Sequence, residues 1–355
     1  MSDDSKMIDA AERQKLNADL SSIHCRVHDP SDPPLFTRQP DSPMQACHWK
    51  WTDLWPMLER LGQKLAIGSG GNRRTLRLAP PGLPYGTTPT FWGSIQVVMP
   101  GEVAAAHRHS ANAFRWITHG SGITTSTVDG ERYEMHQGDL VLTPPMMWHD
   151  HQYEGTEPMV WLDGLDISIM RSVHASFFDP YPAAQQPVLD VCDASYRSYG
   201  SGLMRPPGPP ARTDRNPLLV YPREMSERAL ELAAGLEPDP FDDTILEFQN
   251  PLDGGSALKT LAMCLQRLRP GLHGKARRNT GSKLYQVVRG SGATIVGGRV
   301  FEWETGDYFV VPPWNWHEHI NRSDAEAVLF QVNDIPTLKA LGYYYEEALG
   351  GSGHQ

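Results

Sequence analysis

The chain contains an internal repeat, which predicts that one domain occurs twice. Residues 100–122 (PGEVAAAHRHSANAFRWITHGSG) align without a gap to residues 270–292 (PGLHGKARRNTGSKLYQVVRGSG). A second block follows in each copy, GDLVLTPPMMWHDH at 138–151 and GDYFVVPPWNWHEH at 306–319. Because both blocks recur in the same order, the repeat spans a whole folding unit. The two halves of the chain are therefore expected to share one fold.

The two copies differ in their histidines. His107 and His109 of the first copy align with Arg277 and Asn279 of the second, whereas His149 has a histidine counterpart. Two imidazoles at positions i and i+2 of a strand project from the same face. His149 follows a rigid Pro-Pro turn, which can aim its ring at the same point. The first copy predicts a metal site with three histidine ligands and open coordination positions, and we expect no second metal.

The length and the residue pattern indicate more than one domain. The 355 residues exceed the 250–300 or so that one hydrophobic core usually supports. Short apolar runs broken by Gly and Pro, typical of sandwiches and barrels, dominate both repeat regions. We predict a mainly β protein with five segments: an N-terminal helical extension (1–67), a metal-bearing β-domain (68–169), a linker with a helix (170–242), a second β-domain with a degenerate metal site (243–335), and a C-terminal helix and tail (336–355).

Four segments outside the two β regions have the periodicity of helices. Apolar residues recur at helical spacing in residues 4–23, 51–61, 226–236 and 337–349. The proline-rich stretch at 205–217 is not expected to continue a sheet. The first and last helices are candidates for contacts between subunits.

Composition excludes several classes of protein. The net charge of −10 at pH 7 argues against a nucleic-acid partner, since such proteins need a basic surface. No apolar run is long enough to span a membrane, and the N-terminus lacks the features of a signal peptide. Four widely spaced cysteines fit reduced thiols. We expect a soluble, cytoplasmic enzyme without a membrane partner.

The repeated blocks of the first copy resemble the two cupin motifs. In these motifs a glycine, five residues and HxH are followed later by a glycine, five residues, a proline and a histidine. The matching residues are Gly101, His107, His109, Gly120, Gly138, Pro144 and His149. The usual glutamate of the first motif is missing, because Phe114 and Arg115 stand where it is expected.

The chain more closely resembles the bicupin gentisate and salicylate 1,2-dioxygenases. The resemblance covers most of the chain and lies in the segments 70–83, 89–96, 107–116 and 148–167. It implies two jelly-roll-like β-barrel domains with flanking helices, and a homotetramer. It also implies one Fe(II) in the N-terminal cupin, held by His107, His109 and His149. That iron binds the carboxylate and the adjacent hydroxyl of an aromatic acid, with O2 as co-substrate.

The missing glutamate fits this chemistry. Three neutral imidazoles leave the 2+ charge of the metal uncompensated, so an anionic chelating substrate can neutralise it. Iron is preferred over zinc, because zinc is redox-inert and cannot pass electron density from the ring to oxygen. The ring then opens between the carbons that carry the carboxyl and hydroxyl groups, and gentisate yields maleylpyruvate.

Two arginines and a histidine are predicted to act on the substrate. Arg115 lies six residues after His109, which puts both side chains on one face of a regular strand, and the resemblance places it near the substrate carboxylate, which a guanidinium fits. Arg73 receives a similar role from the resemblance alone. His151 is a candidate acid–base group. The alternatives are a surface arginine on an edge strand for Arg115, and a supporting or exposed histidine for His151.

Three further residues stand in segments that resemble the walls of a substrate pocket. Trp92 is a candidate wall for the aromatic ring, although a tryptophan in a β-sandwich is nearly as often part of the core. Gln96 and Asp163 are candidate partners for a ligand imidazole. All three are predicted to contribute to the substrate site.

The substrate and the reaction class have alternatives. Gentisate is the leading substrate, and 5-nitrosalicylate, a 5-halosalicylate and 1-hydroxy-2-naphthoate are the others, because the geometry at Ser69, Thr75 and Ser94 sets the discrimination. A non-catalytic bicupin that binds a ligand would consume no oxygen. A metal-dependent isomerase or decarboxylase would need none.

Overall fold

The computed structural model describes residues 10–28, 32–67, 74–120, 124–208 and 214–350. The chain divides into two compact units, residues 1–41 and 42–355. The first unit holds helix α1 (Ala10–Ser22), and the second holds both copies of the repeat. Among the helices in these ranges, none has the length and hydropathy of a membrane span.

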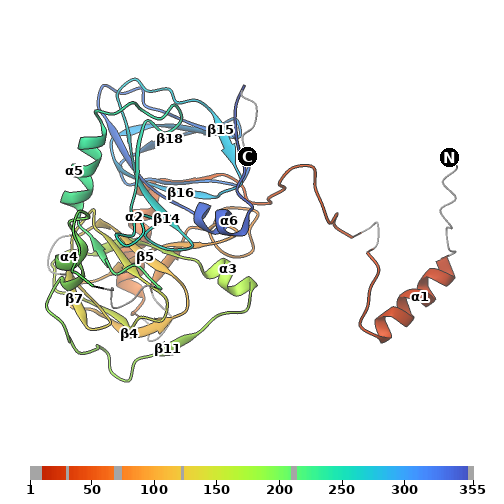
Figure 1. Ribbon diagram of the computed structural model, residues 1–355, viewed down its shortest axis with the longest axis horizontal. Coiled ribbons are helices and arrows are strands. Elements are labelled where there is room, and N and C mark those ends of the chain that lie inside the picture. Colours follow the sequence, from red (N-terminus) through yellow and green to blue (C-terminus); the bar gives the residue numbers. More distant parts are fainter. Residues whose placement is uncertain (1–9, 29–31, 68–73, 121–123, 209–213, 351–355) are drawn as a thin grey trace. The chain divides into compact units, whose positions relative to one another are not determined.

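The first β-domain is a sandwich of two antiparallel sheets (Figure 1). Its six-stranded sheet has the order β12-β8-β5-β10-β3-β2, where the bounds are β2 (Thr75–Arg77), β3 (Trp92–Val98), β5 (Ala113–His119), β8 (Leu140–Thr143), β10 (Met159–Leu165) and β12 (Val220–Tyr221). Its five-stranded sheet has the order β11-β4-β9-β6-β7, where the bounds are β4 (Val103–His109), β6 (Thr124–Val128), β7 (Glu131–Met135), β9 (His149–Tyr153) and β11 (Phe178–Pro180).

The second β-domain repeats this arrangement. Its six-stranded sheet has the order β1-β19-β16-β21-β14-β13, where the bounds are β1 (Cys47–Trp49), β13 (Thr244–Glu247), β14 (Ala262–Leu268), β16 (Lys283–Arg289), β19 (Tyr308–Val311) and β21 (Ala327–Asn333). Its five-stranded sheet has the order β18-β17-β20-β15-β22, where the bounds are β15 (Arg277–Asn279), β17 (Ser291–Val296), β18 (Arg299–Glu304), β20 (His317–Ile320) and β22 (Glu346–Ala348). The central strands of the two six-stranded sheets follow the same order, so the sequence repeat is a structural repeat.

The buried hydrophobic residues in the described part of the chain form three clusters between the four sheets. One cluster lies inside each sandwich, and the largest joins the two six-stranded sheets across the domain boundary. Trp116 of β5 stacks on Phe330 of β21 there, with ring centroids 4.3 Å apart. Strands β10 and β21 are buried along nearly their whole length because both of their faces are covered. In β18, by contrast, only Phe301 and Trp303 point into the core.

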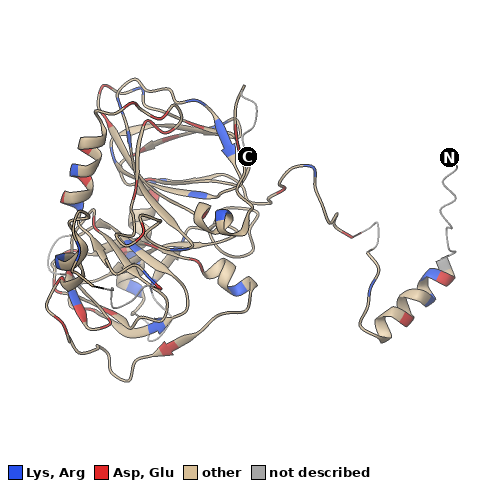
Figure 2. Cartoon of the chain, viewed as in Figure 1, with Lys and Arg blue, Asp and Glu red and all other residues tan. Residues whose placement is uncertain are grey.

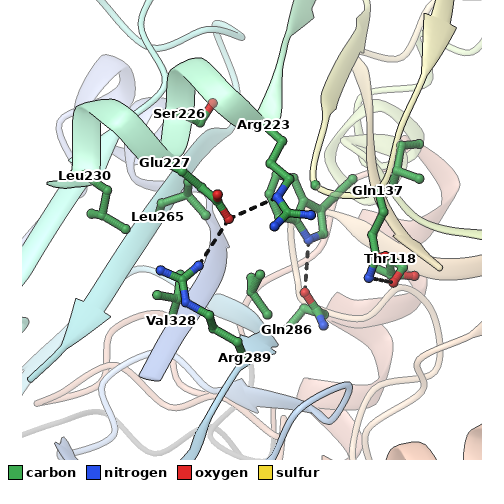
Figure 3. Close-up of a pocket in the computed structure, with 14 residues that line it drawn as sticks. Thr118, Gln137, Arg223, Ser226, Glu227, Leu230, Leu265, Gln286, Arg289 and Val328 are labelled. Atoms are coloured by element: carbon green, nitrogen blue, oxygen red, sulfur yellow. Dashed lines mark hydrogen bonds and ion pairs between the residues drawn. The ribbon is translucent and has the colours of Figure 1, made fainter. Parts of the chain in front are cut away.

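Helix α5 (Arg223–Ala233) lies beside the boundary between the β-domains (Figure 1). It contains both acidic and basic residues (Figure 2). Figure 3 shows Glu227 of this helix between Arg223 and Arg289, which donate to its Oε1 at 3.1 and 3.2 Å. These residues line a cavity of about 130 Å³, where Gln286 accepts a hydrogen bond from the Trp116 indole at 3.0 Å. Polar contacts therefore accompany the apolar packing at the boundary between the two β-domains.

The segments flanking the β-domains differ in part from the prediction. Helix α2 (Trp51–Lys64) forms as expected, but β1 before it pairs with β19, so the N-terminal extension is not wholly helical. The predicted linker contributes β11 and β12 to the sheets of the first β-domain, although a sheet was not expected there. Helix α3 (Ile167–Ser172) crosses the predicted boundary between the first β-domain and the linker, and helix α4 (Ala194–Tyr199) lies within the linker.

The predicted helix at 337–349 is wrong in its second half. Helix α6 (Ile335–Leu341) ends at Gly342, whose φ of 74° is a left-handed conformation that glycine adopts without strain. Residues 346–348 then form β22, which pairs with β15. The tail therefore completes the second β-domain.

Candidate functional site

Three histidines meet on the five-stranded sheet of the first β-domain. His107 of β4 lies directly across from His149 of β9 in the strand register. His109 follows two residues later on β4, and all three rings approach one another with centroid separations of 4.2–5.6 Å. One nitrogen of each ring lies within 4.8 Å of the others. The predicted three-histidine cluster therefore forms.

Backbone carbonyl groups hold the three rings in the same orientation. The Nδ1 atoms of His107, His109 and His149 lie 3.1, 3.1 and 2.9 Å from the carbonyl oxygens of Ala105, Ala111 and Met147. A carbonyl can only accept, so each Nδ1 carries the hydrogen and each Nε2 keeps a lone pair. Each acceptor is two residues from its histidine, so the local backbone sets the tautomer.

The donor set fits a metal ion. The Nε2 atom of His149 is buried and has no hydrogen-bond partner among the described residues, which is costly unless a ligand is bound. Burial and the neighbouring imidazoles of His107 and His109 hold the pKa of His149 well below its usual value. The ring is thus neutral near pH 7, as metal binding requires. Three neutral imidazoles suit Fe(II) and other first-row transition metals.

A cavity of about 370 Å³ opens beside this cluster. It contains both polar groups and aromatic rings, as small-molecule sites do. Its walls include the metal-binding candidates His107 and His109, the predicted residues Trp92, Gln96, Arg115 and Asp163, the pocket residues Thr75 and Ser94, and the further residues Tyr85, Arg171, Phe177 and Phe178.

Arg115 reaches this cavity by a different route from the one predicted. The chain turns between β4 and β5, so Arg115 and His109 lie on different sheets and not on one regular strand. Its Nη1 donates to Thr143 at 2.7 Å, and its Nε lies 3.3 Å from Asp163, the residue opposite it on β10. Asp163 also accepts from the Trp161 indole at 3.1 Å. Arg115 is 6% exposed, which excludes a surface role.

Gln96 and Trp92 occupy the same strand and face the cavity. Gln96 is buried, and its Nε2 has no hydrogen-bond partner within the described part of the chain. Trp92 lies 5.2 Å from the Tyr85 ring, centroid to centroid. Arg73 lies outside the described residues. Its neighbour Arg74 bonds to Glu102 and to the carbonyls of Leu65 and Val97, so that arginine serves the fold.

His151 lies behind the cluster and is not among the described residues that line the cavity. Its ring is 1% exposed and packs 5.4 Å from Trp161 and 6.3 Å from His149. The side chain therefore supports the histidine cluster from the interior of the sandwich.

Sequence reasoning missed part of the cavity wall. Phe178 stacks on His107 with centroids 5.2 Å apart, because β11 pairs with β4 at this point. Arg171 at the end of α3 lies 3.9 Å above the Tyr85 ring. These residues come from segments without a motif, so no local sequence signal identified them.

Two repeated β-sandwiches, with one three-histidine centre among the residues that the structure describes, define a bicupin with a candidate metal site in its first β-domain. The Cupin domain family matches residues 94–166 and 264–333. A 5-aminosalicylate 1,2-dioxygenase from Comamonas sp is 38% identical over 86% of this chain and 83% of its own length. A gentisate 1,2-dioxygenase from Streptomyces sp is 37% identical over 95% of this chain and 97% of its own.

Solved structures give the same result. Salicylate 1,2-dioxygenase from Pseudaminobacter salicylatoxidans matches with a TM-score of 0.87 and 30% identity, over 98% of this chain and 100% of that one. A second structure of a salicylate 1,2-dioxygenase, an adduct with gentisate, matches with a TM-score of 0.87 and 29% identity over 99% and 98% of the two chains. The chain belongs to the bicupin gentisate/salicylate 1,2-dioxygenase family and is a ring-cleaving dioxygenase of that type. The predicted fold class is confirmed, and the non-catalytic and non-oxidative alternatives are set aside.

Proposed function

We propose that this chain is an Fe(II)-dependent gentisate 1,2-dioxygenase, which uses O2 to open the ring between the carbons that carry the carboxyl and hydroxyl groups and forms maleylpyruvate. One observation carries the proposal: the three-histidine cluster and the buried guanidinium of Arg115 serve the same cavity. A metal and a fixed cation side by side suit an acid that chelates through its carboxylate and hydroxyl. The gentisate 1,2-dioxygenase from Streptomyces sp supports this substrate.

The three Nε2 atoms of His107, His109 and His149 would hold the iron, which supplies a redox-active centre with open positions for the chelating acid. Arg115 binds the substrate carboxylate. Its contacts with Asp163 and Thr143 use Nε and one hydrogen of Nη1, so the other Nη1 hydrogen and the two Nη2 hydrogens are left for the substrate. Because Asp163 holds the guanidinium in place before binding, little side-chain entropy is lost when the substrate binds.

Four other residues complete the proposed site. Trp92 forms a wall against the aromatic ring, and the Gln96 amide, which lines the cavity, donates to a polar group of the substrate. His151 does not line the cavity among the described residues, so it would act on the reaction through His149, whose ring centroid lies 6.3 Å away. Arg73 is a second candidate for the carboxylate.

Oxygen uptake by the iron-loaded enzyme tests this proposal. We would compare gentisate, salicylate, 5-aminosalicylate, 5-nitrosalicylate, 5-chlorosalicylate and 1-hydroxy-2-naphthoate, and follow the ring-opened product by absorbance. Stoichiometric uptake with the highest kcat/KM on gentisate is expected. A 5-substituted salicylate is the second candidate, because the relative from Comamonas sp is a 5-aminosalicylate 1,2-dioxygenase. A higher kcat/KM on any other acid would overturn the gentisate assignment.

We also propose that the enzyme is a homotetramer, as the family resemblance implies. One chain has a mass of 39.6 kDa. Light scattering should therefore give about four times that mass, and a monomeric mass would contradict the assignment.

A further inference from the structure

The structural repeat assigns counterparts to the metal centre in the second β-domain. Arg277 of β15 lies opposite His317 of β20 in the strand register, as His107 lies opposite His149 in the first β-domain. The two pairs therefore occupy equivalent positions, and His317 corresponds to His149.

His317 is held in the same way as its counterpart. Its Nδ1 lies 3.1 Å from the carbonyl oxygen of Asn315, two residues earlier, as His149 Nδ1 lies 2.9 Å from that of Met147. The carbonyl again accepts, so the lone pair of His317 is on Nε2. The Nε2 of His317 therefore corresponds to the Nε2 of His149, which would bind the metal in the first β-domain.

In the second β-domain, Lys283 occupies the position equivalent to that of the metal. Its Nζ lies 2.9 Å from His317 Nε2, and the lysine is 1% exposed. Lys283 opens β16 and pairs with Val311, whereas its counterpart Ala113 opens β5 and pairs with Thr143. The short side chain of Ala113 leaves room that the lysine fills in the second β-domain.

The surrounding charges complete this arrangement. Arg277 pairs with Asp242 and lies 3.7 Å from Glu346. Together with Lys283, these residues form a group of two basic and two acidic side chains. Burial and Arg277 lower the pKa of Lys283 to about 7, and Asp242 and Glu346 oppose this effect. The amine has N–H groups to donate in either protonation state.

We infer that the Lys283 amino group takes the place of a metal ion in the second β-domain. Two features therefore exclude a metal ion: the Lys283 amino group fills its position, and Arg277 and Asn279 replace two of the ligand histidines. The second β-domain keeps the polar interior of the fold without depending on a metal supply.

Reconstruction of the ligand set tests this inference. Arg277→His with Asn279→His restores three histidines but retains Lys283, and it should bind no more Co²⁺ per chain than the wild-type protein. Addition of Lys283→Ala, the residue at the equivalent position, should add one Co²⁺ per chain. An extra Co²⁺ in the double variant would overturn the inference, and so would a folded triple variant without one. The count does not depend on catalytic activity, so its failure is distinguishable from failure of the proposed function.

A second experiment avoids the loss of the Arg277–Asp242 pair. Lys283→Ala should leave a cavity that accepts methylammonium, so its Tm should rise by several degrees in methylammonium chloride compared with sodium chloride of equal concentration. Leu284→Ala is the matched control, because it makes a cavity at a buried apolar position beside it. Equal shifts in the two variants would show that no cation-binding position exists.

Discussion

At the scale of single residues, the active site depends on backbone carbonyls that determine histidine tautomers. The same i to i−2 contact orients His107 and His149, while His109 contacts the carbonyl two residues after it. The contact fixes the ring without using Nε2, so this nitrogen is oriented and keeps its lone pair for a metal ion. In the second β-domain the same contact prepares His317 for Lys283.

Removal of one ligand histidine should abolish metal binding. His107→Ala, His109→Ala and His149→Ala should each purify with metal content near zero, because two imidazoles do not hold Fe(II) at an open site. His317→Ala should keep the metal content of the wild-type protein, measured by elemental analysis of iron-loaded samples. Equal loss from His149→Ala and His317→Ala would contradict the single-site assignment.

Replacement of Arg115 should weaken substrate binding. Arg115→Met removes a charge-assisted hydrogen bond to a carboxylate, which is worth about 1.5–3 kcal/mol, so KM should rise about 10- to 100-fold. Arg108→Met is the matched control, because Arg108 pairs with Asp179 and stacks on Trp148 away from the cavity. Steady-state kinetics distinguish the two, and a similar KM in both variants would remove Arg115 from the substrate site.

Lys283 should make stability depend on pH above neutrality. Its pKa in the folded protein is about 7, against 10.5 for an exposed lysine. Between these values the unfolded chain binds the proton and the folded chain does not, so the free energy of unfolding rises with pH. Urea unfolding at pH 7 and pH 9 should show a rise of about 1 kcal/mol per pH unit more in the wild type than in Lys283→Met. The same slope in both proteins would mean that Lys283 keeps its proton.

At the scale of elements, short segments distant in sequence attach to the sheets. Asp307 accepts a hydrogen bond from the Trp51 backbone at 2.7 Å and contacts His48 at 2.9 Å, which joins β1 and α2 to the second β-domain. Gly306, next to Asp307, has a φ of 95°, and a Cβ there would lie 2.6 Å from the Trp51 ring. Glycine is therefore required for this close approach.

Gly306→Ala should destabilise the protein more than the same substitution at another glycine that has a similar φ but open space around its Cβ position. Backbone strain in the left-handed region costs about 1–2 kcal/mol, and the contact with Trp51 adds to it. Gly298 has a φ of 82° and open space around its Cβ position, so Gly298→Ala reports the strain alone. Thermal unfolding should give the lower Tm for Gly306→Ala, and equal values would show that α2 shifts without cost.

At the scale of the whole molecule, the two β-domains share one core, and the active-site strand is part of it. Alternate residues of β5 serve opposite faces: Arg115 lines the cavity, and Trp116 packs against Phe330 of the second β-domain. The second β-domain therefore supports the strand that carries Arg115 into the cavity.

Truncation of Trp116 should show how strongly the stability of the protein depends on packing between the two β-domains. Trp116→Ala should lower the free energy of unfolding by about 3–5 kcal/mol, as large-to-small changes of buried aromatics do. Trp116→Phe keeps the stack on Phe330 and loses the hydrogen bond to Gln286, so it should cost about 1 kcal/mol. Chemical denaturation measures both. A small loss in the alanine variant would mean that the domain boundary contributes little to stability.

The fold class and the three-histidine cluster could be predicted from the sequence because they depend on local regularities. The repeat, the i and i+2 spacing of His107 and His109, and the proline turn before His149 each express a backbone geometry that a few neighbouring residues determine. The departure of Arg277 and Asn279 from this pattern indicated which copy carries the site.

Tertiary structure alone decided the rest of the site. Arg115 and His109 line one cavity because two sheets face each other, Phe178 reaches His107 because β11 pairs with β4, and Lys283 reaches His317 because β16 and β20 lie in opposite sheets of one sandwich. Such contacts join residues far apart in sequence, so no short-range period encodes them. The sequence determined which residue types are present, and the packing of the sheets determined which of them touch.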